Sequence, residues 1–184
     1  MKRIIAILLC LSMILCAVNM LSCSKEVATM GGHPVGKLEF TNDAVDYKFY
    51  YPDSWQTQMN NGMACLYVSS DDPSNVSVTK FGLGDDFKTL DEYISGLPHS
   101  FMNEWNAVFG QTDFGTPADI KLGAADAKQY IYEVTIGDVA YKYMQVFALY
   151  NDSIYTLTYA ARLERFDTHL ENVNALIESF EFKS

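Results

Sequence analysis

The chain has 184 residues, of which 49% are hydrophobic and 20% charged, so its composition is typical of a folded protein and argues against disorder. The formal net charge of −10 argues against nucleic-acid binding, because lysine and arginine have to meet the phosphate groups. The length predicts one ordinary domain.

The first 22 residues have the pattern of a secretory signal. Lys2 and Arg3 precede an uncharged stretch that ends in Leu21-Ser22-Cys23. This end resembles the bacterial lipobox, in which the cysteine receives a diacylglycerol on its sulfur and becomes the first residue after cleavage. We therefore expect a signal peptide at 1–22 and a lipid on Cys23.

Two alternatives remain for this segment. The uncharged stretch is long enough to serve as an uncleaved membrane anchor, or Cys23 lies beside an ordinary signal cleavage site. All three interpretations place the domain outside the cytoplasm. The favoured one places it on a bacterial cell membrane, anchored by lipid on the extracytoplasmic side, so that the membrane is its first partner.

Cleavage before Cys23 would change the charge and the cysteine count. The chain would lose two of its 13 basic residues and none of its 23 acidic ones, so the net charge would become −12. Cys10 and Cys16 would leave with the signal peptide. Cys65 would then be the only thiol of the folded domain, and we expect no disulfide.

Residues 23–36 are predicted to form a flexible tether between the lipid and the domain at 37–184. They contain Gly31-Gly32 and Pro34 and show no periodicity. Short β-rich runs follow. We expect strands at 37–41 and 46–51, then a hairpin of strands 62–69 and 76–83 around the turn sequence DDPSN at 71–75.

Two segments have helical periodicity. Between 89 and 108 apolar residues recur at three and four, Thr89 and Glu92 form a capping box, and Gly96 and Pro98 predict a kink or two short helices. The second helix, at 163–180, has an apolar face of Leu163, Phe166, Leu170, Val173, Ile177 and Phe180.

Three strands between these helices are predicted to form the centre of a sheet, at 128–136, 139–150 and 153–161. Gly137-Asp138 and Asn151-Asp152 suit two-residue hairpin turns, which fix the register. The first turn pairs Ile136 with Val139, Val134 with Tyr141, Glu133 with Lys142 and Tyr132 with Tyr143.

This register separates two largely apolar faces. One carries Tyr130, Tyr132, Val134, Ile136, Tyr141, Tyr143, Phe147, Leu149 and Ile154. The other carries Ile131, Met144, Val146, Tyr155, Leu157 and Tyr159. Because both faces need cover, we predict an α+β fold, a three-layer α/β/α sandwich in which an antiparallel sheet has helices on both faces.

The four tyrosines at the centre of the first face, Tyr130, Tyr132, Tyr141 and Tyr143, have two interpretations. They form a packed layer under a helix, or they form the aromatic floor of a groove for a ligand or partner. A substitution that separates stability from binding would distinguish these interpretations.

Chemical motifs are sparse. His33, His99 and His169 lie too far apart in sequence for a metal motif, and scattered solvated histidines are expected. Cys65 alternates within a strand and is expected to be a buried, inert thiol. The acid pairs Asp71-Asp72 and Asp85-Asp86 cannot share one ion across the strand between them, so we expect solvated turns. We predict no catalytic residue, metal or cofactor.

Two segments resemble PsbP-like domains. Residues 47–55, YKFYYPDSW, resemble their early F-x-Y-P-x-x-W segment, and residues 155–161 with the following helix and 177–182 resemble their C-terminal signature. The resemblance spans roughly residues 38–183. It implies the Mog1/PsbP α/β/α sandwich, which DcrB-like lipoproteins share. Plant PsbP supports calcium and chloride retention in photosystem II, but no histidine or carboxylate motif transfers that role to this chain.

The sequence thus predicts an extracytoplasmic, lipid-anchored binding or accessory module with an unknown protein or small-molecule partner. The alternative is an extracytoplasmic enzyme whose active site is dispersed and carries no motif. A purely structural role in the envelope is the third hypothesis. A compact pocket that joins an aspartate, a histidine and a serine or tyrosine would favour the enzyme.

Overall fold

The computed structural model describes residues 34, 36–60, 62–83, 87–96 and 112–183. Helical residues are 90–96, the 3-10 turn η1 (Leu163–Arg165) and α3 (Phe166–Glu178). The strands are β1 (Lys37–Phe40), β2 (Tyr47–Pro52), β3 (Gln56–Asn60), β4 (Met63–Tyr67), β5 (Asn75–Gly82), β6 (Ala118–Leu122), β7 (Ala125–Ile136), β8 (Val139–Tyr150), β9 (Ser153–Arg162) and β10 (Glu181–Phe182).

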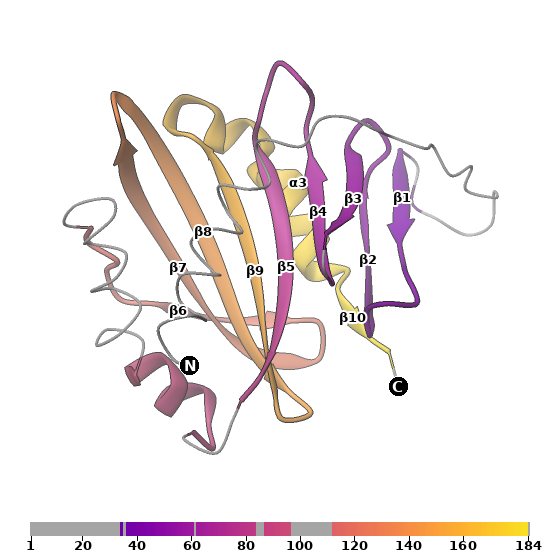
Figure 1. Cartoon of the computed structure of the whole chain (residues 1–184), viewed down its shortest axis with the longest axis vertical. Helices are drawn as coiled ribbons and strands as arrows, with labels where there is room; N and C mark the ends of the chain where they lie inside the picture. The colour runs from indigo at the N-terminus through magenta and orange to yellow at the C-terminus, as the bar shows by residue number, and fades with distance from the viewer. Residues whose placement is uncertain (1–33, 35, 61, 84–86, 97–111, 184) are drawn as a thin grey trace.

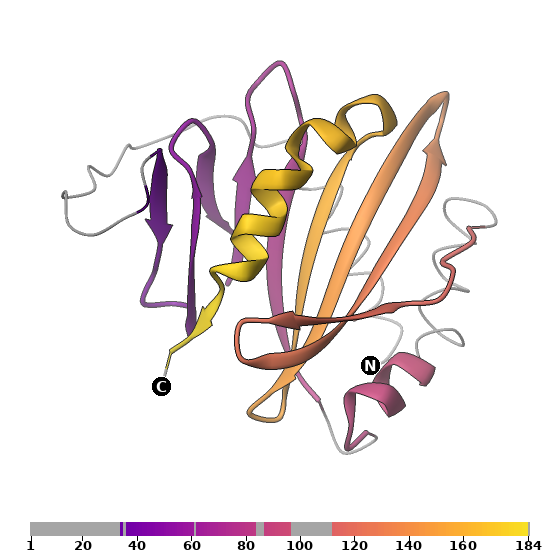
Figure 2. The same cartoon turned by 180° about the vertical axis from the view of Figure 1, so that it is seen from behind.

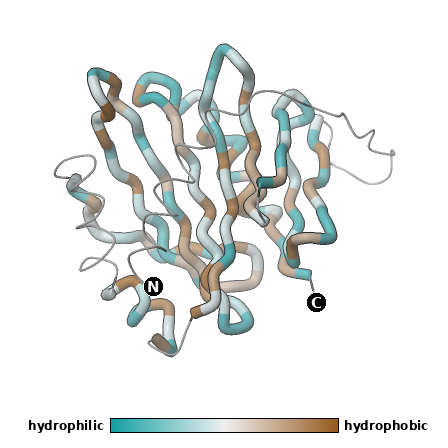
Figure 3. Tube along the Cα trace, viewed as in Figure 1, coloured by the Kyte–Doolittle hydropathy of each residue, from teal (hydrophilic) through white to brown (hydrophobic). Residues whose placement is uncertain are grey.

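A seven-stranded antiparallel sheet forms the body of the domain, in the order β3-β4-β5-β9-β8-β7-β6 (Figure 1). The predicted register of β7 with β8 is confirmed at every pair named above, and β4 pairs with β5 as the expected hairpin. Asn151 and Asp152 both have positive φ, as a type I′ turn requires, and Gly137 has a φ of +62°. Hydrophilic residues gather at these turns (Figure 3).

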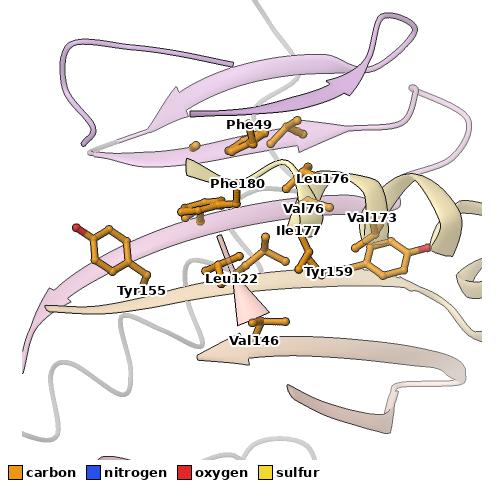
Figure 4. Packing of buried hydrophobic residues seen from close by; sticks show 14 of the residues in the cluster. Phe49, Val76, Leu122, Val146, Tyr155, Tyr159, Val173, Leu176, Ile177 and Phe180 are labelled. Atoms are coloured by element: carbon orange, nitrogen blue, oxygen red, sulfur yellow. The ribbon is translucent and has the colours of Figure 1, made fainter. Parts of the chain in front are cut away.

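The main core lies between one face of this sheet and two covering elements. These are α3 and the small antiparallel sheet β1-β2-β10 (Figure 2). Val76 and Val146 from the large sheet, Phe49 from β2, and Val173 and Leu176 from α3 meet in this layer (Figure 4). The predicted division of the faces therefore holds on this side, where Met144, Val146, Tyr155, Leu157 and Tyr159 are all buried.

Ile131 is the exception on that face. It was predicted to be covered, but its side chain is 44% exposed, because the covering layer does not reach this part of β7. Glu133, two residues further along β7, is also exposed. Over residues 131–134 of β7, only the side chains on the opposite face, Tyr132 and Val134, are therefore buried.

The opposite face carries a second apolar cluster. Its members include all the residues predicted for that face, together with Phe114 and with Ile94 from helix 90–96. Half of the predicted capping box is present, since the Glu92 backbone N–H donates to Thr89 Oγ1 at 3.1 Å, while the Glu92 carboxylate accepts from the backbone N–H of Lys88 at 2.7 Å. The kink predicted near Gly96 and Pro98, and the helix beyond it, fall at 97–111, outside the described residues. The described part of the fold is thus a mostly antiparallel sheet with two helices.

Several boundaries differ from the sequence prediction. β3, β6 and β10 were not predicted. The segments of β3 and β10 lack a clear period-two apolar pattern, whereas that of β6, ADIKL, does alternate and was missed. The second helix was predicted to begin at Leu163, but the chain first makes a 3-10 turn there and leaves Leu163 exposed. The helix ends at Glu178, so Phe180 is buried beyond its end.

The proposed signal peptide at 1–22 and most of the tether at 23–36 lie outside the described residues. Within the described ranges, no helix is long and apolar enough to cross a membrane.

Candidate functional site

The structure places the predicted tyrosine face largely inside the protein. Tyr130, Tyr132 and Tyr143 are buried, and Tyr141 is half-buried. The Tyr132 and Tyr143 rings stack at 5.5 Å between centroids with an interplanar angle of 8°, and Phe114 packs on Tyr132 at 4.6 Å. Whether this layer also meets a ligand or partner stays a prediction.

A buried polar chain crosses the sheet beside these rings. The Tyr132 hydroxyl donates to Gln145 Oε1 at 2.9 Å, and Gln145 Nε2 donates to Thr158 Oγ1 at 3.3 Å. The three residues come from β7, β8 and β9, and all are buried. Because each polar group has a partner inside the layer, the tyrosine face is held in one arrangement.

A second polar cluster, which the sequence reasoning missed, lies at one end of the sheet. Asp72 in the β4–β5 loop is only 8% exposed. One of its oxygens accepts from the backbone N–H and the hydroxyl of Ser74, at 3.1 and 2.6 Å. The other lies 2.9 Å from His169 Nε2 on α3. The predictions of a solvated turn for Asp72 and of a solvated His169 are therefore wrong, because the two side chains contact each other and both are largely shielded from water.

Two further residues complete this cluster. The buried Trp55 ring meets the His169 ring edge-on at 6.0 Å, and Arg165 Nε lies 3.9 Å from the Asp72 carboxylate. Partial burial alone would raise the pKa of Asp72, but the hydrogen bonds from Ser74 and His169 outweigh it and lower that pKa. Asp72 thus stays ionised and holds the β4–β5 loop against α3.

An open hollow of about 370 Å³ lies outside this cluster. It is lined by the β4–β5 loop and by the junction of β9 with η1 and α3. Its lining residues are Asp71, Asp72, Pro73, Arg162, Glu164 and Arg165. The hollow is therefore polar, with both signs of charge on its wall.

The connectivity of the cluster does not match a nucleophilic triad. In such a triad the histidine stands between the serine and the acid, so that it can take the serine proton. Here Asp72 stands between Ser74 and His169, and Ser74 is buried. The geometry suits a rigid support for the hollow better than hydrolysis through Ser74.

Another polar group, at the start of β2, lines a second hollow of about 380 Å³ with Lys80. Asp46 Oδ2 accepts from Lys80 Nζ at 2.6 Å and from the Tyr155 hydroxyl at 2.7 Å. Burial and the hydrogen bond to Asp46 raise the pKa of Tyr155 to about 12. That direction is wrong for a phenolate base, so this group acts as an ion-paired brace between β2, β5 and β9.

The remaining predicted positions add no cluster. Cys65 is buried within β4, as expected. His33, His99 and the pair Asp85-Asp86 fall outside the described residues. In the ranges that the structure does describe, no three histidine, cysteine or acidic side chains come together as metal ligands.

Comparison with solved structures gives the same fold in bacterial proteins. CyanoP, the cyanobacterial PsbP of Synechocystis, is 18% identical, with a TM-score of 0.62 over 85% of this chain and 98% of its own. LpqN of Mycobacterium tuberculosis, a protein involved in cell envelope biogenesis, is 13% identical, with a TM-score of 0.57 over 75% of this chain and 83% of its own. PA94 of Pseudomonas aeruginosa is 14% identical, with a TM-score of 0.50 over 75% and 91%.

These identities establish the fold alone. No curated protein matches the sequence. The sequence does match the PsbP family over residues 36–182, which includes every strand and α3. The chain therefore belongs to the PsbP family.

Proposed function

We propose that this protein is a lipid-anchored binding or accessory module on the extracytoplasmic side of a bacterial cell membrane. The observation that carries the proposal is the uncharged segment that ends in Leu21-Ser22-Cys23, ahead of a PsbP-family domain. Cys23 would carry the lipid, and 23–36 would tether the domain to the membrane. Membership of a family that includes CyanoP and the fold shared with LpqN, an envelope protein, support this setting.

A binding role is favoured over catalysis by the chemistry of the described clusters. Asp72 stands between Ser74 and His169, and the raised pKa of Tyr155 removes it as a base. The alternative of an enzyme keeps one supporting observation, the hollow beside Asp72 and His169. An enzyme would need one of the carboxylates on the open side of that hollow, Asp71 or Glu164, to act as its general acid or base.

The finer fold is part of this proposal. α3 would form one outer layer, and helix 90–96, whose Ile94 packs in the cluster of the tyrosine face, would begin the other. In this three-layer arrangement the tyrosine layer is a packing surface. Tyr141, the half-buried member, is the ring through which a partner would touch it.

The test of the anchor is Cys23→Ala in the native host. We expect the protein to leave the membrane fraction or to accumulate unprocessed, because no sulfur remains to receive the lipid. Cys16→Ala, inside the uncharged stretch, is the matched control and should change neither. Unchanged detergent partitioning and mature mass for Cys23→Ala would contradict the anchor. Proteins and small molecules that co-purify with the wild type from its own membrane would then test the binding role.

A further inference from the structure

The arginines of this chain are concentrated at one place. Apart from Arg3 near the N-terminus, its only arginines are Arg162 and Arg165, and both line the hollow at the end of β9. All other basic residues are lysines. Arginine presents a planar fork of donors that matches a carboxylate or phosphate, so its placement here points to recognition of an oxyanion.

Neither guanidinium group is fully engaged by ion pairs within the described structure. Arg162 is exposed and forms no ion pair with any residue of the described ranges. Arg165 is more than half exposed, and its 3.9 Å approach to Asp72 is too long for a hydrogen bond. Both side chains therefore keep donors that face the hollow and the solvent.

Acids on the same wall are equally unneutralised. Asp71 and Glu164 are exposed, and neither pairs with a basic side chain of the described part of the chain. Glu164 lies between the two arginines in sequence, yet the 3-10 turn does not bring it within ion-pair distance of either. Apart from the long Arg165–Asp72 pair, the opposite charges that line this hollow thus do not pair with each other.

We propose that this hollow binds a free α-amino acid as its zwitterion, with the carboxylate on Arg162 and Arg165 and the ammonium on Asp71 and Glu164. The inference rests on the binding role proposed above and names its ligand class. Asp71 and Glu164 would repel a simple anion, and the arginines would repel a simple cation, whereas a zwitterion meets both. With Asp72 as a third acid, the lining favours a ligand of zero or positive net charge over a dianionic phosphate.

The hollow is suited to such a ligand in size and rigidity. Its volume of about 370 Å³ falls within the range of small-molecule sites, about 300–1,000 Å³. Its inner wall is Asp72, which Ser74 and His169 hold in one position. A wall that is fixed before binding lowers the entropy lost when the ligand is ordered.

Nitrogen-15 NMR of the arginine side chains tests the proposal directly. Once the signal peptide at 1–22 is removed, the chain keeps two arginines, so it gives two Nε–H signals, which Arg162→Gln and Arg165→Gln assign. Alanine and lysine should shift both the Arg162 and the Arg165 signals. Propionate lacks the ammonium of alanine and ethylamine lacks its carboxylate, so each should bind at least tenfold more weakly. Glutamate should bind more weakly than lysine.

Variants assign the two halves of the site. Arg162→Gln and Glu164→Gln should each weaken alanine binding at least tenfold, whereas Lys121→Gln, in an exposed ion pair with Asp126, should not. Propionate that binds as tightly as alanine would identify a simple anion site and overturn the proposal. So would the absence of any shift with amino acids up to about 10 mM, where a ligand with a Kd near 1 mM would occupy most sites. The membrane partition of Cys23→Ala is measured separately, so failure here leaves the anchor standing.

Discussion

Truncation of Tyr143 decides whether the tyrosine layer is a packing surface or a groove. Tyr143 is 5% exposed on β8, and its ring stacks on that of Tyr132. Truncation of a buried aromatic side chain to alanine costs about 3–5 kcal/mol, of which an aromatic pair accounts for about 0.5–1.5 kcal/mol. At about 2–4 °C per kcal/mol for a chain of this size, Tyr143→Ala should lower the Tm by roughly 6–20 °C.

Urea unfolding followed by tryptophan fluorescence, to which the buried Trp55 contributes, measures this loss as a change in midpoint at constant slope. Ile131→Ala is the matched control, because Ile131 lies on the neighbouring strand β7 but is 44% exposed, and it should cost less than about 1 kcal/mol. A loss below about 1 kcal/mol for Tyr143→Ala as well would refute the packing interpretation. The tyrosine face would then become the first surface to test for binding.

Three other predictions concern single positions. Gly123→Ala should destabilise the protein by about 2–5 kcal/mol in thermal unfolding, because the added Cβ would lie 2.3 Å from the Phe180 carbonyl oxygen at a φ of +56°. Gly137→Ala is the control: its φ is +62° but no atom lies within 4 Å of the added Cβ, so it should cost only the backbone strain of about 1–2 kcal/mol. Folding lowers the pKa of Asp72, so its ionised carboxylate should contribute its full stability above the unfolded pKa of about 3.9. That contribution should be lost as the pH falls through the lower folded pKa. The urea midpoints of Asp72→Asn and wild type should therefore differ at neutral pH and converge in acid. Cys65, 1% exposed, should react with a thiol reagent only as fast as the protein unfolds, and rapid labelling of native protein would instead indicate a reactive site.

The centre of the sheet could be predicted because its information is local. Two-residue turns such as Gly137-Asp138 leave one register open to the strands they join, and that register assigns each side chain to a face. The pairing of Tyr132 with Tyr143 follows from counting residues outwards from the Gly137-Asp138 turn, and the structure confirms it. Short edge elements such as β3 and β10 carry no such signal, since a few residues of mixed polarity do not define a period.

The cluster at the end of the sheet could not be predicted in the same way. Asp72 and His169 are 97 residues apart, and only the packing of α3 across the sheet brings them together. In sequence, Asp72 belongs to a turn rich in Asp, Pro, Ser and Asn, which is typical of solvent-exposed loops. The one available signal was compositional: apart from Arg3, arginine occurs only at positions 162 and 165.

The two polar networks of the domain differ in where they end, and this difference separates packing from function. The chain from Tyr132 through Gln145 to Thr158 joins three buried side chains within the tyrosine layer, so it orders the sheet. The network around Asp72 is satisfied on its inner side but opens outwards onto Arg162, which forms no ion pair with a described residue, and Arg165, whose one ion pair with Asp72 is too long for a hydrogen bond. Unused donors beside a rigid wall are what a binding site requires before its ligand arrives, so the end of the sheet, more than its face, suits the binding role that we propose.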